Sequence, residues 1–345
     1  MRTIGISNKT RYWQHYVFSH PPVGYRYKRG WDVPWHRTPV SNWFVLHTKW
    51  FALPWKFDLF HTYNGILVND RPWVVEVESH FPRFGPMQQT HPLYRWGLRR
   101  LAGRDCKWII YTSDHARLNN MDKLTAAGVD PTKLKVVYRA VEQYEPLPME
   151  RQAFTIIFAG NGFYRKGGVE LLKAFQRLDR ADARLVLVSS LEVDWAVRPD
   201  AATVSWVERT IREDPRIELH SQLPHHSVMQ LMRRAHVFVS TTYADPFNNT
   251  VLEAMGARLP IISSRTSSIP EMVQDGGNGW LLDVAGIPGD TIADQIAARL
   301  GQLMDDPALL ERMGIQSHRI VREKFDIRVR NERLKELYDM ALDGR

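Results

Sequence analysis

The chain has 345 residues, of which 44% are hydrophobic, with a mean hydropathy of -0.36 and a formal net charge of +8. This length exceeds what one small core needs and predicts two domains, and the composition is that of a soluble globular protein rather than a disordered chain. The single cysteine, Cys106, excludes an internal disulfide and favours a reducing compartment, so we expect a cytoplasmic protein.

Positive charge and tryptophan are concentrated in the first 150 residues. This part holds 21 Lys and Arg against 12 Asp and Glu, and nine of the twelve tryptophans. Such a mixture suits an anionic membrane surface or lipid-linked acceptor, core packing of the aromatic rings, or stacking on single-stranded nucleic acid. Core packing is the simplest of these alternatives and nucleic acid the weakest. The start of the chain lacks the apolar run of a secretory signal, and no stretch of eighteen apolar residues predicts a transmembrane helix.

Short β-branched and aromatic runs predict strands in both halves of the chain. In the first half a helix is expected to begin near 112–119, and in the second half strands alternate with helical stretches. This alternation predicts parallel sheets covered on both faces. The tail from 306 to 342 is predicted to be helical. The expected strands are 56–60, 72–77, 107–111, 134–138, 154–159, 184–189, 216–219, 236–241 and 260–263.

A glycine-rich loop with two cations follows the predicted strand 154–159. It reads Gly160-Asn161-Gly162-Phe163-Tyr164-Arg165-Lys166-Gly167-Gly168, and apolar residues at helical spacing come next. A strand, a glycine loop with cations and a helix together form a phosphate-binding arrangement. The loop is not a Walker loop, because it lacks the Gly-Lys-Ser/Thr ending, and it does not match the dinucleotide fingerprint G-x-G-x-x-G.

Two acids eight positions apart, Asp245 and Glu253, flank a predicted helix start. Asn248, Asn249 and Thr250 are candidate N-caps, the helix is expected over 251–257, and Pro260 ends it. Free backbone N–H groups at a helix start suit a phosphate, and flanking carboxylates suit hydroxyl groups. The pattern therefore indicates a nucleotide sugar as ligand. The alternative is that both acids simply favour the helix dipole.

With both segments in one chain, the sequence resembles the retaining glycosyltransferases of family 4. The family's acid, seven residues, then Glu pattern is matched with Asp245 where Glu is usual, followed by Glu253-Ala-Met and Pro260, by Ile269-Pro-Glu and by an Asp-Gly-x-x-Gly turn from Asp275. The upstream Gly-x-Gly-Phe-x-Arg-Lys-Gly is most similar to the lipopolysaccharide-core glucosyltransferase branch. The resemblance extends over residues 108–325 and is weak before them.

The resemblance implies an α/β protein of GT-B architecture, with two Rossmann-like domains facing across a cleft. The expected division is 1–145 for the acceptor, 146–325 for the nucleotide sugar, and a helix over 326–345 that packs back toward the first domain. Residues 1–55 depart from the family's usual glycine-rich opening, which indicates a remodelled acceptor side or a membrane-facing lip.

The resemblance also implies roles for individual residues. Glu253 accepts from the ribose, Asp245 from the donor sugar, and Arg165 with Lys166 holds the diphosphate. Asp245 is one methylene shorter than the usual Glu, and Asn161 stands where many members have Arg. The expected donor-binding residues are Gly160, Asn161, Gly162, Arg165, Lys166, Phe247, Asn248, Asn249, Thr250 and Glu253, and the expected catalytic residues are Asp245, Arg165, Lys166 and Glu78.

Glu78 is expected to act in catalysis because it follows the predicted strand 72–77 where the family generally has a His. Glu76 and Glu78 share one face if the strand continues, and either is as well placed to pair with an Arg such as Arg83. His61, at a predicted strand end, is expected to be either structural or functional. The adjacent His225 and His226, expected in a loop, make poor metal ligands, and no Asp-x-Asp pair is present. We therefore expect no metal and no cofactor.

Together with the phosphate-binding pattern and the lack of a metal motif, the resemblance implies retaining, metal-independent transfer of a hexose from a nucleoside-diphosphate sugar to a hydroxyl of a glycan or lipid-linked acceptor. The expected location is the cytoplasm or the inner face of the cytoplasmic membrane, in cell-envelope polysaccharide synthesis. Three alternatives remain: a catalytically inactive relative that keeps the fold, a sugar-nucleotide epimerase, and a nucleic-acid binder.

Overall fold

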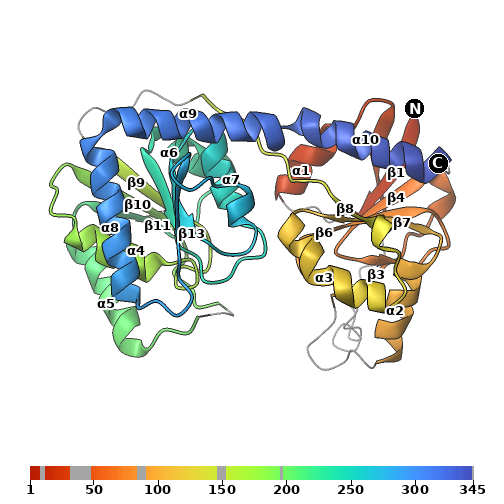
Figure 1. Cartoon of the computed structure of the whole chain (residues 1–345), viewed down its shortest axis with the longest axis horizontal. Helices are drawn as coiled ribbons and strands as arrows, with labels where there is room; N and C mark the ends of the chain where they lie inside the picture. The colour runs from red at the N-terminus through yellow and green to blue at the C-terminus, as the bar shows by residue number, and fades with distance from the viewer. Residues whose placement is uncertain (8–11, 32–47, 84–90, 146–152, 195–196, 344–345) are drawn as a thin grey trace. The chain divides into compact units, whose positions relative to one another are not determined.

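The protein folds into two compact α/β units. The computed structural model describes residues 1–7, 12–31, 48–83, 91–145, 153–194 and 197–343. The first unit comprises residues 1–140 together with 324–345, and the second comprises residues 141–323 (Figure 1). The chain therefore leaves the first unit after Ala140 and returns to it at Lys324, whereas the sequence placed these boundaries near 145 and 325.

The first unit is built on a six-stranded sheet in which all neighbouring strands run parallel. Its strand order is β2-β1-β4-β6-β7-β8, so the chain starts near one edge and moves across the sheet. Parallel strands need crossover connections, and these leave the carboxyl ends of all the strands at the same edge. The strands are β1 (Arg2–Ser7), β2 (Tyr25–Gly30), β4 (Leu59–Tyr63), β6 (Trp73–Val77), β7 (Cys106–Tyr111) and β8 (Leu134–Val136), and β3 (Thr48–Lys49) pairs separately with β5 (Ile66–Leu67).

Helices cover both faces of this sheet. Side chains alternate between the faces along each strand, so that Phe60 and Val75 pack with α2 and α3 while Leu59 and Val74 pack with α10. The other helix of the unit, α1, adds Val17 and Phe18 to apolar contacts on the α10 side. The helices are α1 (Tyr12–Ser19), α2 (Pro92–Ala102), α3 (Asp114–Ala126) and α10 (Ile327–Asp343).

One strand prediction in this unit is wrong in register. The sequence predicted a strand over 56–60, but a short 3-10 helix occupies Pro54–Lys56 and β4 begins at Leu59. Pro54 stands at the start of that turn, where its fixed φ and missing N–H are tolerated. The strand therefore starts three residues later than the apolar pattern indicated, and His61 lies inside it rather than at its end.

The second unit has a parallel six-stranded sheet of order β11-β10-β9-β12-β13-β14. Helices α4, α5 and α8 contribute to its largest apolar core, and α6 and α7 contact β9, β12 and β13. Five of the strands match the sequence prediction to within one residue at most ends, and β14 was not predicted. The strands are β9 (Phe154–Ala159), β10 (Ala183–Val188), β11 (Ile217–His220), β12 (Val237–Ser240), β13 (Ile261–Ser264) and β14 (Gly279–Leu282).

The helices of this unit differ from the prediction mainly near its end. The helical tail is two helices rather than one, separated at residues 325 and 326. The helices are α4 (Gly168–Arg177), α5 (Ala201–Glu213), α6 (His225–Arg234), α7 (Asn249–Gly256), α8 (Gly289–Asp305) and α9 (Pro307–Lys324). His225 and His226 were expected in a loop. That expectation is wrong, because they form the first turn of α6 after Pro224.

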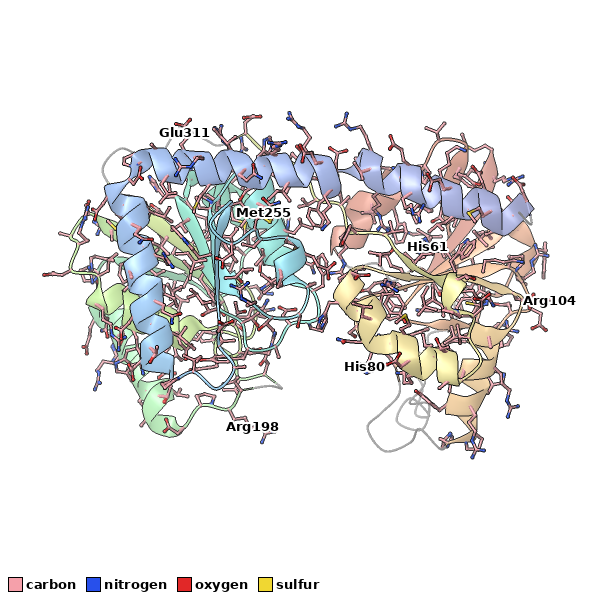
Figure 2. The ribbon with its side chains drawn as sticks, viewed as in Figure 1. His61, His80, Arg104, Arg198, Met255 and Glu311 are labelled. Atoms are coloured by element: carbon pink, nitrogen blue, oxygen red, sulfur yellow. The ribbon has the colours of Figure 1, made fainter. Side chains whose placement is uncertain are left out.

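A buried ionic group fastens α10 to the first sheet. The Arg330 Nη2 donates to the Glu76 carboxylate at 2.6 Å, and the two side chains are each 1% exposed. His61 (Figure 2) contributes from β4, with Nε2 3.3 Å from Glu76 and Nδ1 2.6 Å from the Tyr338 hydroxyl. Burial alone would raise the pKa of Glu76, but attraction to Arg330 and the hydrogen bond with His61 lower it to about 2.

We predict that Arg330→Met destabilises the first unit by about 3–5 kcal/mol, because it leaves the Glu76 charge buried without its cation. The measurement is the free energy of unfolding from chemical denaturation. Arg333→Met on the same helix is the control, since Arg333 and its partner Glu336 are about half exposed and such a pair contributes at most about 1 kcal/mol. Similar losses in the two variants would contradict the assigned role of the buried pair.

Candidate active site

The glycine loop after β9 has a backbone conformation that few residues other than glycine adopt. Gly160, Gly162 and Gly167 have φ values of +145°, +81° and +80°, in the region that disfavours residues with a Cβ. Phe163 is fully buried against Phe158, with ring centroids 5.5 Å apart. The loop is therefore held at its centre by an aromatic ring while its backbone turns sharply on either side.

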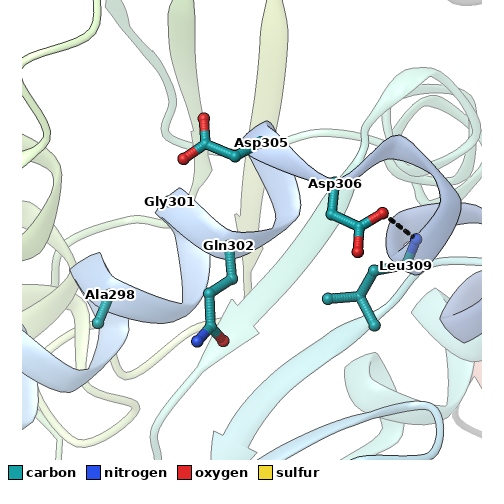
Figure 3. A pocket seen from close by; sticks show the side chains of 6 residues that line it. All are labelled: Ala298, Gly301, Gln302, Asp305, Asp306 and Leu309. Atoms are coloured by element: carbon teal, nitrogen blue, oxygen red, sulfur yellow. Dashed lines mark hydrogen bonds between the residues drawn. The ribbon is translucent and has the colours of Figure 1, made fainter.

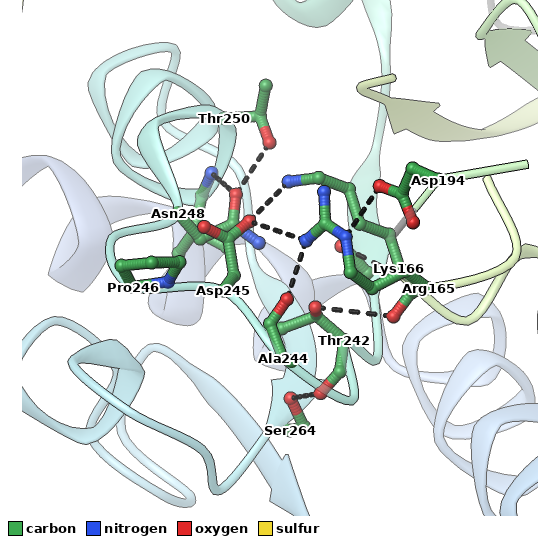
Figure 4. A network of polar contacts seen from close by, with 12 residues as sticks. Arg165, Lys166, Asp194, Thr242, Ala244, Asp245, Pro246, Asn248, Thr250 and Ser264 are labelled. Atoms are coloured by element: carbon green, nitrogen blue, oxygen red, sulfur yellow. Dashed lines mark hydrogen bonds and ion pairs between the residues drawn. The ribbon is translucent and has the colours of Figure 1, made fainter. Parts of the chain in front are cut away.

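The two cations of this loop converge on one acid. Lys166 Nζ lies 2.6 Å from Asp245 Oδ2, and Arg165 Nη1 lies 3.6 Å from the same oxygen (Figure 4). Arg165 is also held by Asp194, which accepts from its Nε at 2.6 Å, and by the carbonyl of Ala244, which accepts from Nη1 at 2.5 Å. The side chains of both cations are about 10% exposed. The loop and the segment before α7 therefore meet at a single, nearly buried ionic cluster.

The start of α7 lies next to this cluster. Asn248 is the N-cap, and its Oδ1 accepts from the backbone N–H of Val251 at 3.4 Å and from the Thr250 hydroxyl at 2.7 Å. Asn249 and Thr250 lie inside the helix, so of the three predicted caps Asn248 serves. The first turn of α7 carries no acid, and Phe247 before it is buried. The positive end of the helix is thus available to an anion beside Lys166.

Glu253 lies one turn further along α7. Its Oε1 is 3.2 Å from Nε2 of His225, the first residue of α6. The Glu253 side chain is 12% exposed and that of His225 is 23% exposed, so both border the surface of this region. Asn161, in the glycine loop, is exposed.

Two of these neighbours were missed by sequence reasoning. Asp194 follows β10 and contacts Arg165, and His225 begins α6 and contacts Glu253. Both contacts join residues that are distant in the sequence. The available signal was weak: both come soon after predicted strands, and the carboxyl ends of parallel strands are where ligands bind in such sheets.

Glu78, the predicted catalytic residue of the first unit, is held by two arginines. Its carboxylate lies 2.5 Å from Arg83 and 2.6 Å from Arg139, and it accepts from the Tyr63 hydroxyl at 2.5 Å. The predicted pairing with Arg83 is confirmed. Burial raises the pKa of Glu78, but attraction to Arg139 and the hydrogen bonds from Tyr63 and Arg139 outweigh it and lower the pKa to about 2. Glu78 is therefore ionised near neutral pH, and proton donation by it is disfavoured.

A hollow on the second unit lies between α8 and α9. Gln302, Asp305, Asp306 and Leu309 are among the residues that line it (Figure 3). Asp306 caps α9 by accepting from the Leu309 N–H at 2.9 Å, and none of the predicted site residues borders this hollow. We assign it no role.

Across the described ranges, no three His, Cys, Asp or Glu side chains gather closely enough to hold a metal ion. In the same part of the chain, no helix combines the length and the apolar character needed to cross a membrane.

Comparison with known families gives a match at the unit that carries the ionic cluster. Residues 153–306 match the family described as "Glycosyl transferases group 1". The chain is 30% identical over 207 residues to MMP alpha-(1->4)-mannosyltransferase of Mycolicibacterium hassiacum. The aligned segment covers 59% of this chain and 47% of that protein. It is 26% identical to alpha-maltose-1-phosphate synthase of Mycolicibacterium smegmatis over 79% of this chain and 78% of that protein. The chain spans about half the length of the curated relatives that match first.

Solved structures align with the whole chain at low sequence identity. Anabaena HepE, solved in complex with UDP, superposes with a TM-score of 0.68 at 15% identity, over 98% of this chain and 100% of HepE. Sucrose-phosphate synthase from Thermosynechococcus elongatus superposes with a TM-score of 0.69 at 14% identity over the full length of both. The chain has the GT-B fold. The predicted fold of two parallel-sheet, Rossmann-like units is thereby confirmed.

We predict that Gly162→Ala weakens binding of a nucleoside diphosphate at least about tenfold. A Cβ at this position would lie 2.1 Å from Asp194 Oδ2 and 2.8 Å from Arg165 Nη2, so the arginine must move. Hydrogen bonds to charged groups contribute about 1.5–3 kcal/mol, and about 1.4 kcal/mol is tenfold in affinity. Titration calorimetry provides the measurement.

Gly286→Ala is the matched control, because Gly286 also has a positive φ (+72°) but no atom lies within 4 Å of the added Cβ. Both variants should lose stability through the same backbone strain, and only Gly162→Ala should lose affinity. Equal affinity in the two variants would show that the Arg165 position does not matter for binding.

Proposed function

We propose that the chain is a retaining hexosyltransferase that moves a sugar from a nucleoside-diphosphate sugar to a hydroxyl of a glycan or lipid-linked acceptor. The observation that carries this proposal is the meeting of Lys166, Arg165 and the amino end of α7 at Asp245. Two cations beside the positive end of a helix dipole suit a diphosphate. The family match at residues 153–306 supports the same chemistry.

Three residues of the cluster and the nearby Glu253 bind the donor in this proposal. Arg165 and Lys166 bind the diphosphate. Asp245 accepts hydrogen bonds from hydroxyls of the donor sugar, and Glu253 accepts them from the ribose hydroxyls. The cluster of Arg165, Lys166, Asp194 and Asp245 is formally neutral. Donor phosphates would compete with Asp245 for Lys166, which would release the Asp245 carboxylate toward the sugar.

The reaction follows from the charges that develop as the bond from the sugar carbon to the phosphate oxygen breaks. Negative charge grows on the diphosphate, where Lys166, Arg165 and the helix start stabilise it, and each well-aimed donor contributes roughly 3 kcal/mol. Positive charge grows on the sugar ring. The acceptor hydroxyl attacks from the face that the phosphate leaves, its proton passes to the departing phosphate oxygen, and the configuration is retained. In this proposal the ionised Glu78 of the first unit orients the acceptor and donates no proton. We propose that no metal takes part.

Two other functions use the same fold. An inactive relative would have lost the donor site, and an epimerase would act on the nucleotide sugar alone. Titration with UDP, GDP and ADP distinguishes the first, because a relative without the site binds none of them. UDP is the first to test, since HepE was solved with it. Release of the nucleoside diphosphate that depends on added acceptor distinguishes transfer from epimerisation.

We predict that Lys166→Ala lowers the transfer rate by about 10²–10³-fold, as loss of a preorganised charge-stabilising group typically does. Glu253→Ala should lower the rate at least about tenfold, because the ribose loses hydrogen bonds to a carboxylate. Lys173→Ala on α4 is the control, because that amine pairs with Asp290 at the exposed surface away from the cluster and should leave the rate unchanged. Nucleotide release measured with acceptor present gives the rate, and near wild-type transfer in either site variant would remove that residue from the mechanism.

A membrane-bound acceptor is supported by the surface of the first unit. Trp31, Trp50 and Trp55 are 61%, 44% and 67% exposed, and we call them the tryptophan patch. The N–H of Ala52 donates to the carbonyl of Trp31 at 3.2 Å, which holds the two segments that carry the patch together. Of the other tryptophans before residue 60, Trp35 and Trp43 lie outside the described residues, as does the side chain of Trp13.

The charge near this patch matches an anionic lipid surface. Lys28 on β2 and Lys56 beside Trp55 are exposed, and tryptophan rings favour the headgroup level of a bilayer. The core alternative accounts for Trp73, which is buried, and for Trp108, whose Nε1 donates to the Leu337 carbonyl. It does not account for the tryptophan patch. We therefore propose a peripheral position on the cytoplasmic membrane.

We predict that the double variant Trp31→Ala, Trp55→Ala binds phosphatidylglycerol vesicles at least about tenfold more weakly than the wild type. Burying a large apolar side chain contributes about 1.5–3 kcal/mol, so the loss of two is measurable by co-sedimentation. Leu118→Ala is the control, since Leu118 is a 49%-exposed apolar side chain on α3 of the same unit. Unchanged vesicle binding, or tighter binding of a single-stranded oligonucleotide at moderate salt, would remove the membrane proposal.

A further inference from the structure

A histidine outside every predicted set contacts the carboxylate expected to bind the ribose. His225 Nε2 lies 3.2 Å from Glu253 Oε1, and the two residues come from different helices, α6 and α7. Within the described residues, the Glu253 carboxylate makes this hydrogen bond through Oε1. In that part of the chain, no hydrogen bond to its other oxygen, Oε2, accompanies it.

The geometry divides the two carboxylate oxygens between two tasks. A ribose presents two neighbouring hydroxyls, and each needs an acceptor. A glutamate has three rotatable bonds and loses rotamer freedom when it is fixed, so a second group that holds the carboxylate lowers the cost of binding. The imidazole of His225 can hold Oε1 through a protonated Nε2 and leave Oε2 and the remaining lone pair of Oε1 for the ribose.

We infer that His225 is a positioning residue for donor binding, which sets the orientation of Glu253 toward the ribose hydroxyls. This inference rests on the proposed function, in which Glu253 accepts from the ribose. It assigns the ribose-binding unit to a pair of side chains from α6 and α7 rather than to one glutamate. Discrimination between ribose and deoxyribose then depends on His225 as well as on Glu253.

The chain provides a matched control in the next residue. His226 lies in the same helical turn, but its Nε2 is 3.2 Å from the Ser227 hydroxyl at an exposed position. His226→Ala therefore removes the same side chain from the same turn of α6 without removing a contact to Glu253. His225→Gln keeps a donor nitrogen on a side chain of similar reach.

The experiment measures how strongly each protein distinguishes ribose hydroxyls. UDP, GDP and ADP are titrated into the wild type by calorimetry, and the tightest binder is then compared with its 2′,3′-dideoxy counterpart. In the wild type, loss of the hydroxyls should weaken binding at least about tenfold, as expected for hydrogen bonds to a carboxylate. In His225→Ala this ratio should fall at least about threefold, while His226→Ala keeps it and His225→Gln largely restores it.

The outcomes separate the inference from the proposed function. If the wild type binds none of the three nucleotides, or if Glu253→Ala keeps the full ratio, the donor site is misassigned and the inference falls with it. If Glu253→Ala abolishes the ratio but His225→Ala preserves it, the proposed function stands and the inference alone is wrong. A purely structural role for His225 would lower the melting temperature of His225→Ala and leave the ratio intact, which also overturns the inference.

Discussion

The ion pair between Lys166 and Asp245 joins two segments that the sequence separates by 79 residues. It depends on the strand order, because β9 lies directly beside β12 and both run in the same direction. Their carboxyl ends therefore lie together, and the loops that follow them reach the same point. Three features of the two segments accompany this ion pair: the sharp turns at Gly160 and Gly162, the helix start at Asn248, and the fixed position of Arg165. The arrangement of the second sheet is thus the physical origin of the candidate site.

Much of the fold could be predicted from the sequence where strands are central and apolar. Residues 156–159 and 261–264 are buried, and the sequence marks both strands by apolar pairs, Ile156-Ile157 and Ile261-Ile262. The strand Tyr25–Gly30 was missed because it lies at an edge of the first sheet. Its sequence, Tyr-Arg-Tyr-Lys-Arg-Gly, exposes its cations and has no apolar signal. Edge strands take their position from a neighbour, here β1, and composition does not record that neighbour.

The site residues divide in the same way. Glycines, cations and caps have local signatures, and these placed Lys166, Asn248 and Glu253 in the right elements. Asp194 and His225 have no such signature, since each is defined by a contact across the fold. Pro224 made the segment before His225 resemble a loop, although a proline commonly stands at the beginning of a helix. From the sequence, the cations and Asp245 were predicted to bind separate parts of a ligand. In the structure they form ion pairs with one another.

The position of α10 has a consequence for the order in which the protein is made. Its side chains Leu334, Leu337 and Tyr338 complete a core whose other members, such as Ile4 and Leu59, are synthesised roughly three hundred residues earlier. All of the residues of the second unit leave the ribosome before this helix does. The middle of the chain can therefore close on itself while the beginning still waits with an open apolar face, so the usual order of domain folding during translation is reversed. Until α10 emerges, the face of the first sheet that it covers remains exposed, and exposed apolar surface favours aggregation.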